Sequence, residues 1–430
     1  MMWVLVIALI VAAFIGVPVF LIIGAGTLLG YYAAGSDLSG LFIEVYKIAT
    51  NPVFTAIPLF IFAGYIMSAS KTPQRLVNLS RALLGWMPGG LAVVSLITCA
   101  FFTAFTGASG VTIIAMGGLL YPVLLKERYS EDFTLGLLTT TGSLGLLFPP
   151  SLPLILYAVI AGNAYTSISG QPSITIDKLF IAALIPGIIL VVALSIYSIF
   201  IGYKTGVNKT KFKWSELLRT AKEARYEIPL PIIILVGIYG GFFTVSEAAA
   251  ITAIYVLIME VFLYGDISIR KDLSKVIKES SILTGALIAI IGMALAFTNY
   301  VIEQEVPFYL VELMKQYIST KTSFLMILNV FLIVICMIDN FSAILIVVPL
   351  IIPIANSFGV DPYHLGVIFL INLEIGFLTP PIGLNIFISS LRFRHNVIDV
   401  FRATIPFYLV LVVCLILITY IPWITLFLIR

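Results

Sequence analysis

Two acidic residues, Asp339 and Glu374, stand inside otherwise apolar parts of the sequence. A charged side chain at membrane depth costs several kcal/mol, so such a residue is a functional candidate by default. Asn340 and Asn385 add amide groups beside them. These residue types bind ions or polar solutes, and we predict Asn340, Glu374 and Asn385 as substrate contacts. The alternative for Asp339 and Glu374 is a structural role, as a helix cap or as the partner of an interfacial base.

The elements that position these residues must lie in a membrane. Of the 430 residues, 61% are hydrophobic and only 10% are charged, whereas soluble proteins carry about 25% charged residues. Too few polar residues remain to cover a water-facing surface, which excludes a soluble enzyme and a nucleic-acid-binding protein. The net charge of +3 is too small to indicate a polyanionic partner. We expect an all-α polytopic membrane protein with about 11–13 hydrophobic segments.

Long uncharged runs supply the candidate membrane crossings, each of which takes roughly 20 helical residues. The runs cover residues 1–36, 82–125, 133–176, 179–203, 228–246, 280–302, 340–360 and 403–429. Two of them, 82–125 and 133–176, are each 44 residues long, about twice the length that one helical crossing needs. Both must therefore fold back or break inside the bilayer.

Small residues and prolines mark where these two runs turn. Residues 106–110 (Thr-Gly-Ala-Ser-Gly) suit the tip of a re-entrant hairpin, and the pair Pro149-Pro150 stops a helix. Irregular backbone at membrane depth is tolerated only where protein or a watery cavity covers it. The simpler alternative is an ordinary loop between two spans together with a proline kink.

Two basic segments divide the chain into halves. Residues 203–226 carry seven Lys or Arg residues against two Glu residues, and residues 265–279 carry four more basic residues. The chain between them has room for two membrane crossings, which would return it to the side it left. Both basic segments should therefore be cytoplasmic, because positively charged loops remain on that side.

The two halves are related by a shift of 231 residues. This shift places Gly145 on Gly376 and Pro149-Pro150 on Pro380-Pro381, which indicates an internal repeat. Repeated halves with broken segments at matching places are typical of transporters. A broken helix exposes amide groups at one half-helix start, which favour anions. It exposes carbonyl groups at the other half-helix end, which can replace the water around Na⁺.

Sequence motifs of several other classes are missing. The chain has no Gly-x-x-x-x-Gly-Lys-[Ser/Thr] motif for ATP and no His-Glu-x-x-His pair. Its three cysteines are far apart in apolar sequence and form no iron–sulfur or haem-attachment motif. We therefore expect that the chain is not an enzyme and uses no ATP. A membrane-embedded hydrolase acting through Asp339 or Glu374 is the alternative from a different class.

Four ordered motifs carry a family resemblance. They are residues 56–64 (AIPLFIFAG), 145–157 (GLLFPPSLPLILY), 240–248 (GGFFTVSEA) and 372–385 (NLEIGFLTPPIGLN). Together they resemble the large, DctM-like membrane subunit of tripartite ATP-independent periplasmic (TRAP) transporters, over essentially the whole chain. The resemblance implies a multi-pass protein of the bacterial inner membrane with two inverted repeats. It also implies an elevator-type ion-transporter fold, in which a transport domain moves against a scaffold.

The resemblance further implies Na⁺-coupled import of an organic acid, such as a C4-dicarboxylate or a sialic acid. Two partners are implied: a small DctQ-like membrane subunit of about four helices and a DctP-like periplasmic substrate-binding protein. The alternative within transporters is a stand-alone Na⁺-coupled di- or tricarboxylate symporter that works without a binding protein.

The motif match also implies two Na⁺ sites, formed mostly by backbone carbonyls. One would consist of Ser109, Thr112, Gly142, Gly145 and Pro149, and the other of Asp339, Ser342, Gly376, Thr379 and Pro380.

We divide the chain accordingly into five parts. Residues 1–81 are scaffold helices and an interfacial arm, 82–176 the first hairpin and broken helix, 177–300 further scaffold helices with the basic loops 203–226 and 265–279, 301–392 the second hairpin and broken helix, and 393–430 a C-terminal helix.

Overall fold

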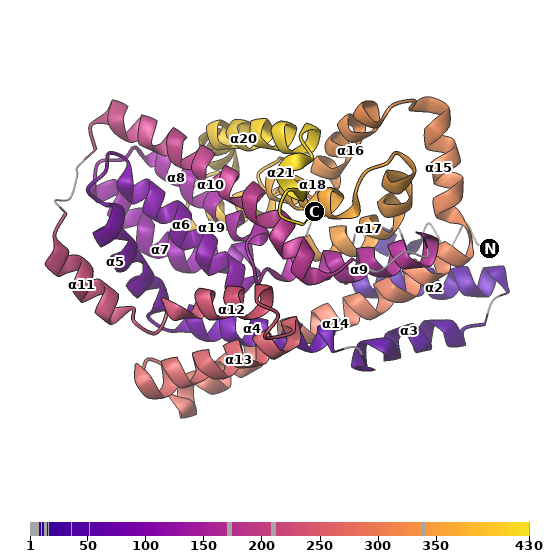
Figure 1. Cartoon of the computed structure of the whole chain (residues 1–430), viewed down its shortest axis with the longest axis horizontal. Helices are drawn as coiled ribbons and strands as arrows, with labels where there is room; N and C mark the ends of the chain where they lie inside the picture. Colours follow the sequence, from indigo (N-terminus) through magenta and orange to yellow (C-terminus); the bar gives the residue numbers. More distant parts are fainter. Residues whose placement is uncertain are drawn as a thin grey trace.

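The computed structural model describes residues 8, 9, 11, 12, 15, 17–35, 37–50, 52–169, 174–207, 212–337 and 340–429. Its regular elements in these ranges are all helical (Figure 1). Within them, six helices are long and apolar enough to cross a membrane, and three bent helix pairs raise this number to as many as nine. The prediction of an all-α polytopic membrane protein is confirmed.

The first half of the chain contains one hairpin and one broken helix. Its elements are α2 (Val19–Ala34), α3 (Ser39–Thr50), α4 (Val53–Ala69), α5 (Thr72–Leu84), α6 (Gly90–Thr106), α7 (Ser109–Lys126), α8 (Glu131–Thr141), the 3₁₀ turn η1 (Leu144–Leu147), α9 (Leu152–Ser169) and α10 (Ile176–Thr205). We call α6 and α7 hairpin 1, and residues 148–151 between η1 and α9 the first break.

The second half repeats this arrangement after a connecting region. Its elements are α11 (Trp214–Glu223), α12 (Pro229–Tyr239), α13 (Val245–Ile258), the π-helical turns η2 (Met259–Leu263) and η3 (Ile269–Leu273), α14 (Ser274–Glu303), α15 (Val306–Tyr317), α16 (Lys321–Ile335), α17 (Asn340–Ser357), α18 (Pro362–Gly376), α19 (Leu384–Phe393), α20 (Val397–Tyr420) and α21 (Trp423–Leu426). We call α16 and α17 hairpin 2, and residues 377–383 between α18 and α19 the second break.

Local sequence signals start the two broken helices at equivalent places. Ser130 caps α8 by accepting a hydrogen bond from the backbone N–H of Phe133. Asp361, exactly one repeat shift later in the sequence, caps α18 by accepting from the N–H groups of Tyr363 and His364. A polar cap at this position pairs donors that the first helical turn leaves free. The internal repeat therefore extends to the caps.

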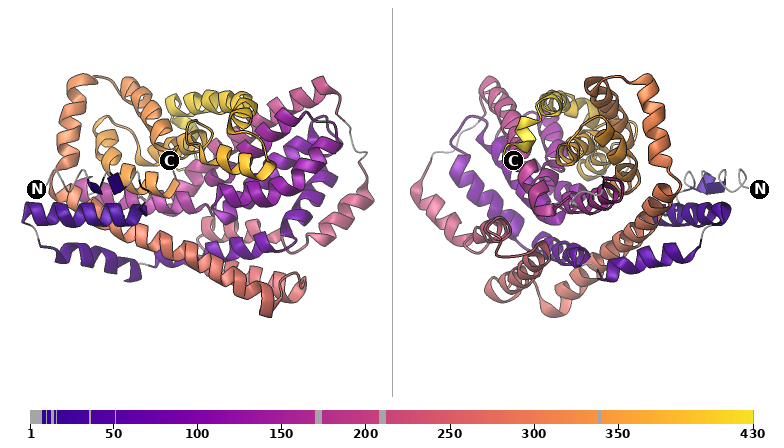
Figure 2. Two further views of the ribbon diagram at one scale, coloured as in Figure 1. Left: turned by 180° about the vertical axis from the view of Figure 1, so that it is seen from behind. Right: turned by 45° about the vertical axis from the view of Figure 1, so that its right-hand side comes forward.

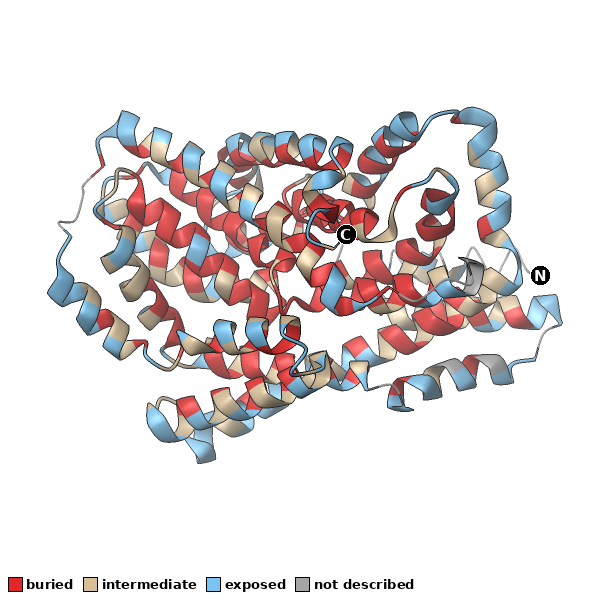
Figure 3. Ribbon diagram, viewed as in Figure 1, coloured by how far each residue is buried: buried red, intermediate tan, exposed pale blue. Residues whose placement is uncertain are grey.

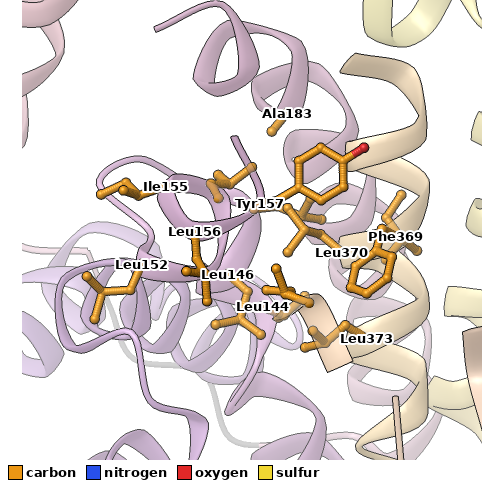
Figure 4. Close-up of a cluster of buried hydrophobic side chains, with 14 of the residues drawn as sticks. Leu144, Leu146, Leu152, Ile155, Leu156, Tyr157, Ala183, Phe369, Leu370 and Leu373 are labelled. Carbon is orange, nitrogen blue, oxygen red and sulfur yellow. The ribbon is translucent and has the colours of Figure 1, made fainter. Parts of the chain in front are cut away.

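The two repeats interlock. The second half of each broken helix packs against the hairpin of the other repeat, α9 against α17 and α19 against α7. Figure 4 shows part of the resulting core, in which Leu144 and Leu146 of η1 and Tyr157 of α9 meet Phe369 and Leu373 of α18. Neither repeat can bury its apolar faces without the other.

Helix α14 runs beside the interlocked repeats and packs along α2, α3 and α4, while α13 packs on α4 (Figures 1 and 2). Figure 3 shows buried residues concentrated in the hairpins and broken helices, whereas α3, α11 and α15 at the edges are mostly exposed. Helix α10, which we grouped with the scaffold, packs against α6, η1, α18 and α20. Helix α5 runs past the boundary drawn after residue 81 and ends at Leu84.

A side chain next to the second basic segment contacts the first. The hydroxyl of Tyr264, next to the second segment, donates to the backbone carbonyl of Glu223 in the first at 2.6 Å. The same hydroxyl lies 2.6 Å from the carboxylate of Glu227. The chain between these segments therefore leaves and returns to one side through α12 and α13.

Candidate functional site

The tip of hairpin 1 meets the end of α8 through one threonine. The hydroxyl of Thr103 in α6 lies 2.7 Å from the hydroxyl of Thr112 in α7. It also lies 3.0 Å from the carbonyl oxygen of Gly142, which follows α8. Thr103 and Thr112 are fully buried. Two predicted residues, Thr112 and Gly142, are thus brought together in a cluster of oxygen atoms.

Glycines let the broken helices approach the hairpins at backbone distance. A methyl group added at Gly145 would lie 2.3 Å from the carbonyl oxygen of Ala100 in α6. A methyl group at Gly376 would lie 2.7 Å from the carbonyl oxygen of Cys336, directly after α16. Real Cβ atoms do not approach oxygen this closely, so each glycine is needed where a broken helix touches its own hairpin. The aligned glycines make equivalent contacts in the two repeats.

The second break is a tight loop held by its own backbone. The N–H of Gly383 donates to the carbonyl of Thr379 at 2.9 Å, and the N–H of Asn385 donates to the carbonyl of Phe377 at 3.2 Å. The Thr379 hydroxyl donates to the carbonyl of Ile375 at 2.8 Å. Pro380 lies in this loop, as Pro149 lies in the first break. Each of these carbonyls keeps a second lone pair for another ligand.

Asn385 joins the two repeats. Its side-chain amide donates to the hydroxyl of Ser143 at 3.1 Å and to the carbonyl of Thr139 at 3.3 Å, both at the end of the first broken half-helix. Its side chain is fully buried, and no described residue donates to its Oδ1 atom. Asn385 therefore fixes α19 against α8 and leaves one buried acceptor free.

Other buried oxygens in the same region also lack a partner among the described residues. They are the hydroxyls of Thr106 at the end of α6, Thr140 in α8, Ser151 at the first break and Ser389 in α19. Buried polar atoms in proteins are paired in roughly nine of ten cases, so a group of exceptions needs an explanation. These oxygens lie on the tip, the break and the half-helices that the repeat predicts for ligand binding.

The remaining predicted residues of the hairpin tips begin helices. Ser109 starts α7, and Asn340 starts α17, with Ser342 buried in the first turn of α17. The Asn340 side chain accepts from the backbone N–H of Phe341 at 3.0 Å. Asp339 lies outside the described residues.

Glu374 is buried in α18, and neither of its carboxylate oxygens has a hydrogen-bond partner among the described residues. Residues two apart in a helix point to different sides, and Gly376 is the residue that contacts Cys336, directly after α16. The Glu374 side chain therefore points away from that contact.

The direction of the helices sets the electrostatics of the tips and breaks. Helices α7 and α17 start at the hairpin tips, and α9 and α19 start at the breaks, so free N–H groups with partial positive charge point there. Helices α6 and α16 end at the tips, and η1 and α18 end at the breaks, which supplies carbonyl oxygens. The arrangement offers oxygen ligands for a cation and amide groups for an anion.

The sequence analysis missed Thr103. Its signal is the spacing of nine residues to Thr112 across the predicted tip, which places the two hydroxyls on the facing helices α6 and α7. In an apolar helix a threonine usually bonds only its own backbone, as Thr98 does with Val94 at 2.6 Å. Only the packed hairpin distinguishes the two threonines.

The family model for "Tripartite ATP-independent periplasmic transporter, DctM component" matches residues 4–424. The chain is 31% identical to the C4-dicarboxylate TRAP transporter large permease protein DctM of Vibrio cholerae, over 96% of this chain and 93% of that protein. It is 33% identical to the isethionate TRAP transporter permease protein DctMQ of Oleidesulfovibrio alaskensis, over 96% of this chain and 64% of that longer protein.

Among solved structures, the YdaH transporter of Alcanivorax borkumensis has a similar fold. It aligns with a TM-score of 0.63 at 13% sequence identity, over 89% of this chain and 87% of that one. At this identity the similarity concerns the fold alone.

We expect Asn385→Leu to lower the free energy of unfolding by about 1–3 kcal/mol, because it leaves the buried Ser143 hydroxyl without its donor. The measurement is thermal unfolding of the purified protein in detergent. Asn356→Leu, on the exposed end of α17, is the matched control and should change stability by less than about 0.5 kcal/mol. Equal melting temperatures for the two variants would show that Asn385 does not hold the repeats together.

Proposed function

The chain belongs to the DctM family and is the large permease subunit of a TRAP transporter, and on that basis we propose that it imports an organic acid together with Na⁺. The observation that carries this proposal is the group of buried oxygens without hydrogen-bond donors at the tip of hairpin 1, the first break and α19. Neutral hydroxyl, amide and carbonyl oxygens are ligands for a hard cation such as Na⁺.

The type of oxygen supports a monovalent ion as cargo. In the described ranges, no three His, Cys, Asp or Glu side chains gather as a transition-metal site would require. The cluster of Thr103, Thr112 and the Gly142 carbonyl is built from uncharged oxygens, which suits an ion of single charge that must be released in each cycle. The anionic substrate would lie against the helix starts at Ser109, Asn340 and Leu384.

The substrate class is a carboxylate or a related organic acid. One relative is named for C4-dicarboxylates and another for isethionate, a sulfonate, so relatives of similar identity differ in their named cargo. A site built from helix starts and backbone groups accepts any compact anion of suitable shape. We propose that substrate choice depends largely on a periplasmic binding protein that delivers the acid.

We also propose that the hairpins and broken helices move together past α4 in an elevator motion. A methyl group at Gly64 of α4 would lie 2.7 Å from the carbonyl oxygen of Phe105 and 2.8 Å from the Cα atom of Thr106. The tip of hairpin 1, at the end of α6, therefore contacts α4 at a position that has no side chain. A side chain there would obstruct sliding of the tip along α4.

The partners proposed are a small membrane subunit and a periplasmic binding protein, in the bacterial inner membrane. The relative named DctMQ is a longer chain of which this chain covers 64%, which supports a second membrane component beside the large one. Outward faces of α10 and α16 carry exposed apolar side chains, such as Phe200 and Val330, that need lipid or a membrane partner.

The direct test is uptake in reconstituted vesicles that contain the chain with its small subunit. We expect uptake of a labelled C4-dicarboxylate, isethionate or sialic acid only with an inward Na⁺ gradient and the cognate binding protein present. Replacing Na⁺ with K⁺ while keeping the membrane potential is the control. Uptake that persists without Na⁺ would contradict ion coupling, and uptake of free substrate without the binding protein would identify a stand-alone symporter.

Thr103→Val should raise the Na⁺ concentration for half-maximal uptake about five- to tenfold, because valine keeps the shape but removes the oxygen between Thr112 and Gly142. Thr98→Val is the matched control on the same buried helix, since its hydroxyl bonds only the carbonyl of Val94. The same Na⁺ dependence in both variants would remove Thr103 from the ion site.

Gly64→Val should lower the maximal uptake rate by about tenfold or more, since overpacking by a side chain costs about 1–3 kcal/mol and obstructs hairpin 1. Gly285→Val in α14 is the control, because a methyl group at Gly285 meets nothing within 4 Å. The amount of each variant in the membrane is measured by immunoblot. Full uptake by Gly64→Val at normal abundance would contradict sliding along α4.

A further inference from the structure

An apolar groove runs between α6, α10 and α12, beside the first break. Its volume is about 280 Å³. Side chains from residues 97–105 of α6 and 184–192 of α10 line it, along about 12 Å of each helix. Pro231 and Leu235 of α12 also line it. All the described residues of the lining are apolar, so the groove is unlike the polar region at the hairpin tips and breaks.

Small side chains on α6 help to form the groove. Ala100 and Ala104 both line it, and they are four residues apart, which places them on the same face of the helix. Leu184 and Ile188 of α10 line it with the same spacing. Helix α12 packs mainly on α13, and α13 packs on α4, the helix past which hairpin 1 is proposed to move. The groove therefore separates α6 from a helix on the α4 side.

The groove reaches the first break. Phe148 and Pro149 belong to the break and line the groove. The Phe148 ring lies on α10 at Gly187, where an added methyl group would be 3.0 Å from its Cζ atom. Ser151, whose buried hydroxyl has no partner among the described residues, lies in the same break. A molecule in the groove would therefore contact the backbone segment that carries part of the polar region.

The groove opens on the outer surface of the helices. Ile97 of α6 and Ile188 and Val192 of α10 line it, and they are 42%, 48% and 49% exposed. On α12, Ile232 and Val236 are exposed next to the two residues that line the groove. Helix α10 is long and apolar enough to cross the membrane, so its exposed apolar residues contact hydrocarbon. The groove is therefore continuous with the lipid-facing surface.

The chemistry of the lining selects a hydrocarbon occupant. A water molecule needs two to four polar partners, and the described residues of the lining offer no polar side chain. An empty groove would leave its lining without van der Waals partners. Lipid tails are as apolar as leucine and fit such a surface. A free fatty acid would bring a carboxylate without a nearby cation from the lining, whereas a phospholipid keeps its headgroup at the membrane surface.

We propose that one acyl chain of a bilayer phospholipid occupies this groove and forms part of the surface along which hairpin 1 and the first break move past α12. The binding site follows from the groove itself, and the role in movement rests on the motion proposed above. An acyl chain changes its conformation as the walls around it shift. A bulky side chain attached to one wall cannot adapt in this way and would obstruct the movement.

Photolabelling of the complete complex in vesicles tests the binding site. The probe is a phosphatidylethanolamine with a diazirine in one acyl chain, and labelled residues are identified by mass spectrometry. We expect label on Phe101, Phe148 and Leu184, which line the groove and are only partly exposed. Leu409 and Val413, exposed on α20, report ordinary contact with lipid. Label on α20 without label on the three groove residues would overturn the site.

Filling the groove should displace the acyl chain. Ile188→Trp places an indole at its mouth, and Ala100→Leu fills it from α6. Ile196→Trp is the matched control, because Ile196 is 63% exposed on α10, about two helical turns from Ile188, and does not line the groove. We expect both filling variants to lower the groove label by about threefold or more, and the control to retain it. Full label in both filling variants would overturn the proposal.

Labelling with and without the small subunit distinguishes a lipid from a partner helix as the occupant. A lipid site should be labelled in the complete complex and in vesicles that contain the large subunit alone. Groove label that is found only when the small subunit is absent would identify that subunit as the occupant. This result would overturn the lipid assignment.

Uptake by the same variants tests the role in movement. We expect Ile188→Trp to lower the maximal uptake rate by about three- to tenfold and Ile196→Trp to change it by less than about twofold, at equal abundance in the membrane. Normal uptake by Ile188→Trp after loss of the groove label would overturn this role. The Na⁺ dependence of the unaltered complex reports separately on the proposed function, because photolabelling needs neither uptake nor ion coupling.

Discussion

The structure depends on one constraint, which is that interrupted backbone in the membrane interior must find its partners within the protein. Both breaks meet this constraint through the hairpins, because Gly145 and Gly376 allow backbone to touch backbone. The interlocking of α9 with α17 and of α19 with α7 follows from it. The helix after each break packs against the hairpin of the other repeat, so the two halves form a single unit.

This constraint also explains the chemistry of the site. Buried oxygens without a partner among the described residues are found at the tip of hairpin 1, in the first break and in the adjoining half-helices, on Thr106, Thr140, Ser151, Asn385 and Ser389. Burying such an oxygen without a hydrogen bond costs free energy in an apolar interior. The same oxygen can serve as a ligand when a cation is bound. Binding through helix ends and neutral oxygens needs few charged side chains. It is consistent with relatives that are named for chemically different acids.

The two arginines of α5 differ in how far their ion pairs are buried. Arg75 is shared by three buried or nearly buried carboxylates, whereas Arg81 has one partly exposed partner. Helix α5 itself packs against α6 of hairpin 1 as well as against α11, so it joins the hairpin to the segments that follow α10.

The sequence by itself determined the membrane class, the repeat and the places of the breaks, because charge depletion, Pro-Pro pairs and aligned glycines act locally on the backbone. It also singled out Asn385 beside the second break, and the family resemblance added Thr112 and Gly142. Only the tertiary structure decided which residues meet: Thr103 joins that region, and Arg75 gathers carboxylates from three distant segments. Helical periodicity gives the face of a residue within its own helix, whereas its partners are set by how the two repeats cross, and that depends on packing across the whole chain.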